Sequence, residues 1–286
     1  MSNQNRICRR VYMPGPSIAH PADLVRDMWT DMFAGRSLAW RFAVRDIKAQ
    51  YRQTLLGILW ALILPLANTI TWIFLDWTGV VTVGTTDLPY SIYVFTGTML
   101  WSIFMEALNA PLTQANSARS MLTKIKFPYE ALIMSGILQT LFNGGIKIAL
   151  LLVTLISFGI YPDWRLILVP MAVMSLILAG ITLGLLITPI GLLYADIGKG
   201  IPLVMQFLMF VTPVVLPIPS KGWARFVYEY NPLTPLIITA RQWLTSFPSD
   251  YLWHFMIINM ILILMLFAVT VIYRLTMPIL IERMGA

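Results

Sequence analysis

The stretch FMIINMILILMLFAVTVIY at residues 255–273 has no charged side chain and is long enough to cross a lipid bilayer as a helix. Comparable apolar runs occupy 55–75 and, apart from Lys147, 131–160. Of the 286 residues, 58% are hydrophobic and 12% are charged, and the mean hydropathy is +0.75. A soluble chain of this length could not bury so much apolar side chain. The sequence therefore predicts an all-α membrane protein.

Six membrane spans are predicted, with both chain ends in the cytoplasm. The spans are 55–77, 89–110, 130–160, 166–193, 201–217 and 252–274. The basic residues that then fall outside are Arg165, Lys221, Arg225 and Arg241, and all others beyond the spans fall inside. Because cytoplasmic loops of membrane proteins are rich in Lys and Arg, this topology explains the net charge of +7. No nucleic-acid partner is needed.

The first 54 residues form no long apolar region, so no cleavable signal peptide is predicted. We divide the chain into a cytoplasmic segment, 1–54, and a membrane domain, 55–286. Cys8 is the single cysteine, which excludes a disulfide framework.

The region after the fifth span does not have the composition of an ordinary solvated loop. The span ends in TPVVLPIP at 212–219, which cannot continue as a regular helix. The next stretch, 220–250, is aromatic and apolar. It predicts one or two short helices that re-enter the outer leaflet under the cover of protein. An interfacial loop with an aromatic belt is the alternative.

Residues 22–34 predict an amphipathic helix that lies along the cytoplasmic membrane surface. Apolar side chains recur there at helical spacing. The opposite face is mostly acidic, with Asp23, Asp27 and Asp31. Simple anchoring in the membrane and a protein partner on the acidic face are both open.

A stripe of positive charge follows this helix. Its members are Arg41, Arg45, Lys48 and Arg52. Steps of three and four residues place them on one side of a helix. At headgroup depth they could hold the phosphate of an ordinary lipid or of a lipid-pyrophosphate carrier. Ordinary positive-inside charge is the alternative.

The third span carries a polar stripe in an otherwise apolar helix. Ser135, Gln139, Asn143 and Lys147 recur every four residues, so they should face protein or water. Glu106 is predicted near the cytoplasmic end of the second span, too far from Lys147 to pair with it. Two predictions for Lys147 follow. Its side chain could extend toward the outer interface, or it could line a substrate path together with Gln139 and Asn143.

Aromatic side chains on the first and fifth spans offer a second substrate-path hypothesis. They include Trp60, Trp72, Phe207 and Phe210. Sugars stack their C–H faces on aromatic rings, so these residues could line a carbohydrate path. Belts of aromatic residues at the membrane interfaces explain them equally well.

The connection between the second and third spans, 111–128, predicts a short amphipathic cytoplasmic helix. Its apolar positions are Leu112, Ala115, Ala118, Leu122 and Ile125. Such a helix could fit a groove on a cytoplasmic subunit, or it could rest on the membrane.

The chain lacks the motifs of an ATPase or a metalloenzyme. No phosphate loop is present, since the only Gly-Lys pair, Gly198-Lys199, has the wrong spacing, and no Cys/His metal motif occurs. Catalytic, cofactor and metal sites are therefore not predicted. Any active transport must be powered by a partner.

Several motifs resemble one protein family. The most specific is RDIKAQYRQTLLGILWALILPL at 45–66, and shorter ones are KIKFP at 124–128, YADI at 194–197, TPV at 212–214 and Asn231-Pro232. Together they resemble the permease subunits of polysaccharide-exporting ABC transporters, the type-2 exporter branch that serves O-antigen and teichoic-acid export.

The resemblance implies a homodimer bound to two copies of an ABC ATPase, which would hold ATP and Mg. It implies export of an undecaprenyl-pyrophosphate-linked glycan across the bacterial inner membrane, as in lipopolysaccharide biosynthesis. The residues that would couple to the ATPase are Asn116, Arg119, Ser120, Leu122, Tyr194 and Asp196. The outer gate would include Trp223, Tyr228, Tyr230 and Trp243. Ala195 departs from the family, whose members often have a basic residue there.

Two rival functions remain open. An ABC exporter of a drug, a small lipid or a capsule glycan is the closest. A membrane scaffold or an intramembrane transferase is the other. A transferase would need a paired acid or histidine near the membrane, and a scaffold would not need proline-broken spans.

Overall fold

The computed structural model describes residues 21–52, 55–79, 88–122, 128–219 and 221–285, and in these ranges the chain is helical with no strand. This confirms the predicted all-α fold. Five helical segments are long and apolar enough to cross a membrane. They are Gly57–Trp77, Tyr90–Ser117, Glu130–Ser157, Trp164–Leu193 and Leu252–Arg283. Most of the predicted motif at 124–128, and with it Ile125, lies outside the described residues.

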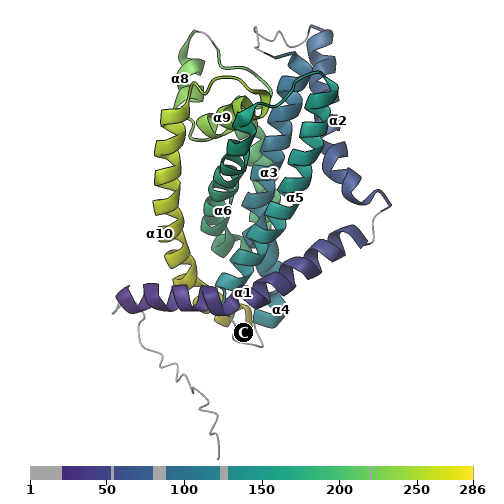
Figure 1. The fold of residues 1–286 in the computed structure, drawn as a ribbon. Coiled ribbons are helices and arrows are strands. Elements are labelled where there is room, and N and C mark those ends of the chain that lie inside the picture. The colour runs from purple at the N-terminus through teal and green to yellow at the C-terminus, as the bar shows by residue number, and fades with distance from the viewer. Residues whose placement is uncertain (1–20, 53–54, 80–87, 123–127, 220, 286) are drawn as a thin grey trace, which may run out of the picture.

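The long helices run side by side, and α1 lies across one end of them (Figure 1). We name this the α1 end and the opposite one the α8 end. The helices are α1 (Pro21–Arg52), α2 (Trp60–Trp77), α3 (Tyr90–Ser117), α4 (Arg119–Leu122), α5 (Glu130–Ser157), α6 (Val169–Leu193), α7 (Ala195–Phe210), α8 (Trp223–Tyr230), α9 (Leu233–Thr245) and α10 (Leu252–Gly285). Short 3-10 turns, Gly57–Leu59 and Trp164–Leu168, precede α2 and α6.

Helix α3 forms the centre of the bundle and packs closely on α6. A Cβ atom added to Gly180 would lie 2.5 Å from the Cβ of Ala107 and 2.7 Å from the carbonyl oxygen of Phe104. Gly184 lies equally close to the backbone of Leu108. Small residues one turn apart allow two membrane helices to approach this closely. The pair α3–α6 is therefore closely packed at the core of the fold.

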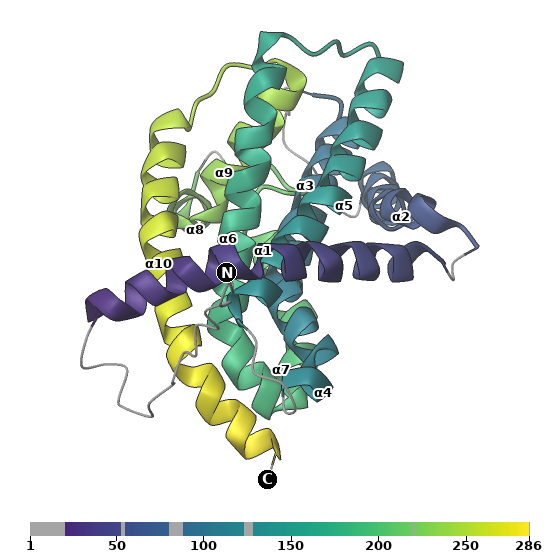
Figure 2. The same ribbon diagram turned by 60° about the horizontal axis from the view of Figure 1, so that its bottom comes forward.

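The predicted surface helix and the basic stripe belong to one continuous helix, α1 (Figure 2). Its small residues Gly35, Ala39 and Ala43 are buried, and a Cβ on Gly35 would lie 3.2 Å from that of Ala131 on α5. Trp29 and Phe33 are exposed and stack with ring centroids 6.0 Å apart. An exposed aromatic face of this kind agrees with an interfacial helix.

One residue of the acidic face of α1, Asp31, has a partner within the chain. Nη2 of Arg274, on α10, lies 2.6 Å from Oδ2 of Asp31. Nη1 of the same arginine pairs with Glu130 at the start of α5. Asp31 therefore joins α1 to α10, and a protein partner for the rest of the acidic face stays a prediction.

The second span is longer than predicted. Helix α3 continues through Pro111 to Ser117, and the four-residue helix α4 follows directly. The amphipathic pattern holds, because Leu112, Ala115, Ala118 and Leu122 are all buried.

The predicted fifth span, 201–217, is not among the five apolar segments. Helix α7 has 16 residues, and turns follow it up to Leu216. The sixth crossing thus stays a prediction. Two helices, α8 and α9, follow as predicted, and α9 is largely buried. Their re-entry into a membrane also stays a prediction.

Candidate functional site

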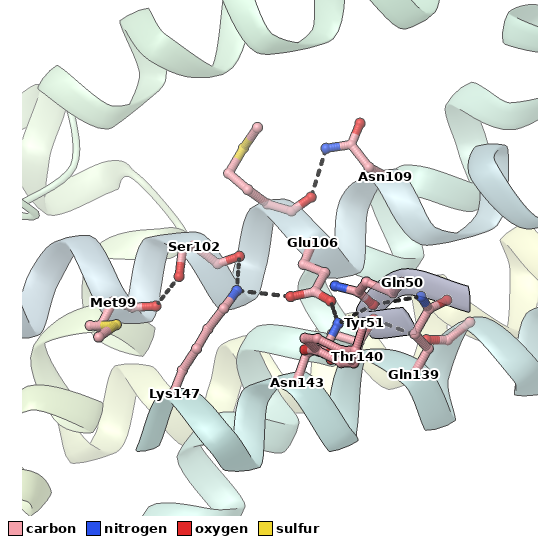
Figure 3. A network of polar contacts seen from close by, with 12 residues as sticks. Gln50, Tyr51, Met99, Ser102, Glu106, Asn109, Gln139, Thr140, Asn143 and Lys147 are labelled. Carbon is pink, nitrogen blue, oxygen red and sulfur yellow. Dashed lines mark hydrogen bonds and ion pairs between the residues drawn. The ribbon is translucent and has the colours of Figure 1, made fainter. Parts of the chain in front are cut away.

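Lys147 and Glu106 form an ion pair between α5 and α3 (Figure 3). Nζ of Lys147 lies 2.8 Å from Oε2 of Glu106 and donates a second hydrogen bond, 3.3 Å long, to the carbonyl oxygen of Ser102. The other carboxylate oxygen accepts from the side-chain amide of Asn143. The two charged side chains are 10% and 25% exposed. The pair is thus nearly buried, and each charge is satisfied by the other.

The prediction that Glu106 lies too far from Lys147 was wrong, and so was the outward extension of Lys147. At 1.5 Å per residue, Glu106 lies roughly 17 Å from the end of α3 and Lys147 roughly 26 Å from the start of α5. The two helices run in opposite directions (Figure 1). Because each side chain leans toward the N-terminus of its own helix, the two lean toward each other. Both side chains are long, and together they span the remaining distance between the two helix positions.

The end of α1 joins the same network (Figure 3). The Tyr51 hydroxyl donates to Oδ1 of Asn143 at 2.9 Å. Oε1 of Gln50 accepts from the amides of Gln139 and Asn143, both at 3.2 Å. Gln114 in turn donates to Oε1 of Gln139 at 2.9 Å. The network therefore connects α1, α3 and α5 and follows α3 toward α4.

A cavity of about 440 Å³ opens beside this network. Burial, and secondly the Glu106 carboxylate, raises the pKa of Tyr51, so its phenol stays protonated as a donor. Predicted path residues Trp60, Asn143 and Lys147 meet in the cavity wall, and Gln139 adjoins them through Gln50. The cavity is lined by Gln50, Tyr51, Gly57, Trp60, Ala61, Leu64, Pro65, Ser102, Glu106, Asn143 and Lys147.

The other predicted path residues lie elsewhere. Trp72 and Phe210 meet edge to face, with ring centroids 5.7 Å apart, and so join α2 to α7. Phe207 is exposed on the outside of the chain. None of the three lines the cavity. The structure therefore divides the predicted path into two separate groups.

The four predicted gate residues do not form one cluster. Trp223 and Tyr230 are exposed on α8. Tyr228 is buried, and its hydroxyl donates to the carbonyl oxygen of Phe210. Trp243, only 2% exposed, packs edge to face on Phe255 and belongs to the core. Its aromatic side chain supports α9 and α10 and offers no surface for a passing ligand.

The basic stripe is exposed along α1 as predicted. Arg41, Arg45, Lys48 and Arg52 are all exposed. Nε of Arg45 lies 2.7 Å from Oδ1 of its neighbour Asp46, so part of its charge is balanced locally. None of the four lines the cavity.

The residues predicted to couple to an ATPase gather at the α1 end. Helix α7 begins beside the end of α3, where Leu112 packs against Gly191 and Gly198 (Figure 2). This contact brings two exposed segments to one face, which we call the α4–α7 face. Its exposed residues are Asn116, Arg119, Ser120, Tyr194 and Asp196. Leu122 is buried, so it anchors α4 and offers no surface for a partner.

Sequence reasoning missed Arg241, which it counted as a loop charge. This arginine of α9 is buried, and Nη2 donates to the carbonyl oxygens of Pro213 at 2.8 Å and Val214 at 2.9 Å. Its guanidinium lies 3.7 Å from the ring centroid of Tyr93 on α3. The sequence did contain a signal for this contact. Prolines interrupt the segment 212–219, and backbone carbonyl groups that are freed in this way need hydrogen-bond donors wherever they are buried.

A comparison with known families identifies the architecture. The family model described as ABC-2 type transporter matches residues 38–244. The chain belongs to the ABC-2 transporter membrane family. The matched range contains the whole polar network, the basic stripe, the α4–α7 face and all of α9 but its last residue, whereas α10 of this ABC-2 subunit follows it.

Several curated proteins resemble this ABC-2 subunit. The O-antigen export system permease protein RfbA of Myxococcus xanthus is 24% identical over 210 residues, 72% of this chain and 80% of that protein. A Klebsiella pneumoniae protein of the same name is 21% identical, with 69% and 76% covered. The polysialic acid transport protein KpsM of Escherichia coli is 22% identical, with 70% and 78% covered. The resemblance found in the motifs is thus confirmed.

Proposed function

We propose that the chain is the membrane subunit of an ATP-driven exporter that moves a lipid-pyrophosphate-linked polysaccharide of the O-antigen type from the cytoplasm to the periplasm. The observation that carries the proposal is the match to relatives named for O-antigen export, over 80% and 76% of their length. A capsule glycan is the second candidate substrate, because KpsM, named for polysialic acid transport, matches over 78% of its length.

The subunit works as a homodimer in the bacterial inner membrane, together with two copies of a separate ABC ATPase. Since the chain has no phosphate loop of its own, ATP and Mg are held by that partner. The membrane subunit is then a transport component and not an enzyme. The α4–α7 face is the surface that receives the movement of the ATPase.

A sixth crossing by α7 is supported by where its two ends lie. Helix α7 begins at the α1 end, next to Leu112. The chain after α7 reaches the start of α3, because the Tyr93 hydroxyl donates to the carbonyl oxygens of Pro213 and Leu216. Six crossings place both termini on one side, the cytoplasm. Burial of Arg241 removes one of the four outside charges and so strengthens the positive-inside bias.

In the proposed mechanism the pyrophosphate meets the basic stripe of α1 at the inner leaflet. ATP-driven closure of the partner pushes on the α4–α7 face, and the movement separates α2 and α7 from their copies in the second subunit. The glycan crosses between them, and the re-entrant helices α8 and α9 close the outer end.

The proposal is tested by deleting the gene from its host and measuring surface polysaccharide. Deletion should remove the glycan from the cell surface and cause its lipid-linked form to accumulate inside. A tagged copy should restore export and co-purify an ABC ATPase in equal numbers. Normal surface glycan in the deletion strain, or ATP hydrolysis by the purified chain alone, would contradict the proposal.

Changes on the α4–α7 face should weaken the complex with the ATPase. Tyr194→Ala combined with Asp196→Lys should reduce the ATPase that co-purifies by about tenfold, since two interface positions are lost. Both residues are exposed, so the melting temperature should not change. Lys221→Glu, an exposed charge near α8, is the matched control and should leave the complex intact.

Reversing charge in the basic stripe should reduce export without unfolding the protein. For Arg45→Glu with Arg52→Glu we expect export to fall by about tenfold, as expected from losing charge-assisted phosphate contacts. The control is Arg36→Glu, because Arg36 is exposed and lies about 180° around α1 from Arg45 at 100° per residue. Export by the double variant at the level of this control would exclude the headgroup role.

A further inference from the structure

The cavity beside the Lys147–Glu106 pair is bordered by three helices long and apolar enough to cross a membrane, α2, α3 and α5, but is not lined as a lipid contact. Its walls come from α1, α2, α3 and α5. The Glu106 side chain is 25% exposed. A carboxylate that faces hydrocarbon is strongly unfavourable. The cavity must therefore hold water or a polar ligand.

The polar groups of the cavity carry no net charge. The Lys147 ammonium is paired with the Glu106 carboxylate at 2.8 Å. The other hydrogen-bonding side chains of the lining are two amides, a phenol and a hydroxyl, those of Gln50, Asn143, Tyr51 and Ser102. A phosphate would need unpaired positive charge, and the exposed cations of α1 do not line this cavity. Amides and a phenol together offer donors and acceptors, the combination that hydroxyl groups satisfy.

Part of the cavity lining is apolar. Trp60 is 46% exposed and is joined by Ala61, Leu64 and Pro65 of α2. An indole presents a broad apolar face, against which the C–H face of a sugar ring can pack. The volume of about 440 Å³ lies within the range of small-molecule sites. The lining thus combines polar groups with an indole, around a space large enough for a sugar ring.

We infer that this cavity is a water-filled site that binds one uncharged, hydroxyl-bearing sugar ring, with Trp60 against its C–H face and the Gln50–Asn143–Glu106 side toward its hydroxyls. The inference rests on polysaccharide export as the proposed function. It adds a sugar contact that is separate from the phosphate contact on α1, and it places that contact between helices of one subunit.

Thiol accessibility tests the site without any transport assay. In the full chain in lipid nanodiscs, Cys8→Ser removes the native thiol, and Ala61→Cys or Leu64→Cys adds one in the cavity wall. The control, Leu264→Cys, lies on the exposed side of α10 and outside the cavity. A charged methanethiosulfonate reacts with the thiolate, which forms in water, so both cavity thiols should react at least about tenfold faster than the control.

Protection by sugars tests the ligand class. A ring of about a dozen heavy atoms should bind with a Kd of about 5 mM. The methyl glycosides of glucose, galactose, mannose and N-acetylglucosamine are each added at about 50 mM, and at least one should slow labelling of Leu64→Cys by about tenfold. Trp60→Ala should abolish this protection, and glycerol should give none.

Each other outcome overturns the inference. Cavity thiols that react as slowly as Leu264→Cys would exclude a water-filled site. Fast labelling that no glycoside slows would exclude a sugar site, and protection by inorganic pyrophosphate instead would make it a phosphate site. The gene-deletion experiment tests the export function independently of this site. Loss of surface glycan with unprotected thiols would reject this site alone, whereas normal surface glycan would reject the export function itself.

Discussion

Lys147→Met is expected to lower the free energy of unfolding by about 3 kcal/mol. The substitution keeps most of the side-chain volume but leaves the Glu106 carboxylate without its counter-ion. That carboxylate is three-quarters buried and would keep only the amide of Asn143. Unfolding in one detergent, followed by tryptophan fluorescence, measures the change.

A double-mutant cycle separates the ion pair from other effects of the substitution. Glu106→Gln alone should also destabilise, because it leaves the Lys147 ammonium unpaired. The double variant should be less harmful than the sum of the two single changes, with a coupling energy of about 2 kcal/mol. Lys199→Met, at an exposed position 4.0 Å from Asp196, should change stability little. Strictly additive losses at 106 and 147 would contradict a functioning pair.

Arg241→Met is expected to cost about 3 kcal/mol, since the buried carbonyl of Val214 loses its donor, at about 1–3 kcal/mol, and the face of Tyr93 loses its cation, at about 1 kcal/mol. Val214 lies in the broken segment after α7 next to Pro213, whose carbonyl also loses Arg241 but keeps the Tyr93 hydroxyl as a donor. The same change removes the cation from the face of Tyr93. Without Arg241, the chain between α7 and α8 should be held less firmly on α3, through the Tyr93 hydroxyl.

Arg241→Lys provides the graded comparison. Lysine keeps the charge but lacks the planar fork and stacks poorly, so we expect an intermediate loss of about 1–2 kcal/mol. Arg225→Met is the matched control, because Arg225 is exposed and its ion pair with Glu229, one turn away, lies at the surface. Denaturant midpoints of all three variants give the ranking. Equal midpoints for Arg241→Met and Arg225→Met would show that the buried arginine holds nothing in place.

The helices of this fold were predictable because each apolar run is set by residues close together in sequence. The buried positions of the coupling segment, from Leu112 to Leu122, were predictable for the same reason. Helix ends were harder, since Pro111 suggested an end that tertiary packing overrides. That single error placed Glu106 at the wrong depth and hid its contact with Lys147.

The parts that sequence did not predict depend on distant partners. Arg274 and Asp31 lie 243 positions apart, and no local period connects them. Arg241 was counted with the outside charges because its burial depends on the carbonyls of the broken segment. Trp243 was assigned to the gate because an aromatic residue in the core and one at an interface look the same in sequence.

Helix α1 is tied to α5 near both of its ends. Arg274 bridges Asp31, near its start, to Glu130, and Tyr51 near its other end bonds Asn143. A helix held at two separated points cannot swing away from its support, so α1 and α5 should travel together when the ATPase pushes. By contrast, within Trp60–Trp77 only Pro65 and Thr69 are buried. Motion of the α1–α5 unit should therefore change the angle between this unit and α2. We expect the angle of α2 to differ more between the closed and open transporter than that of any other helix.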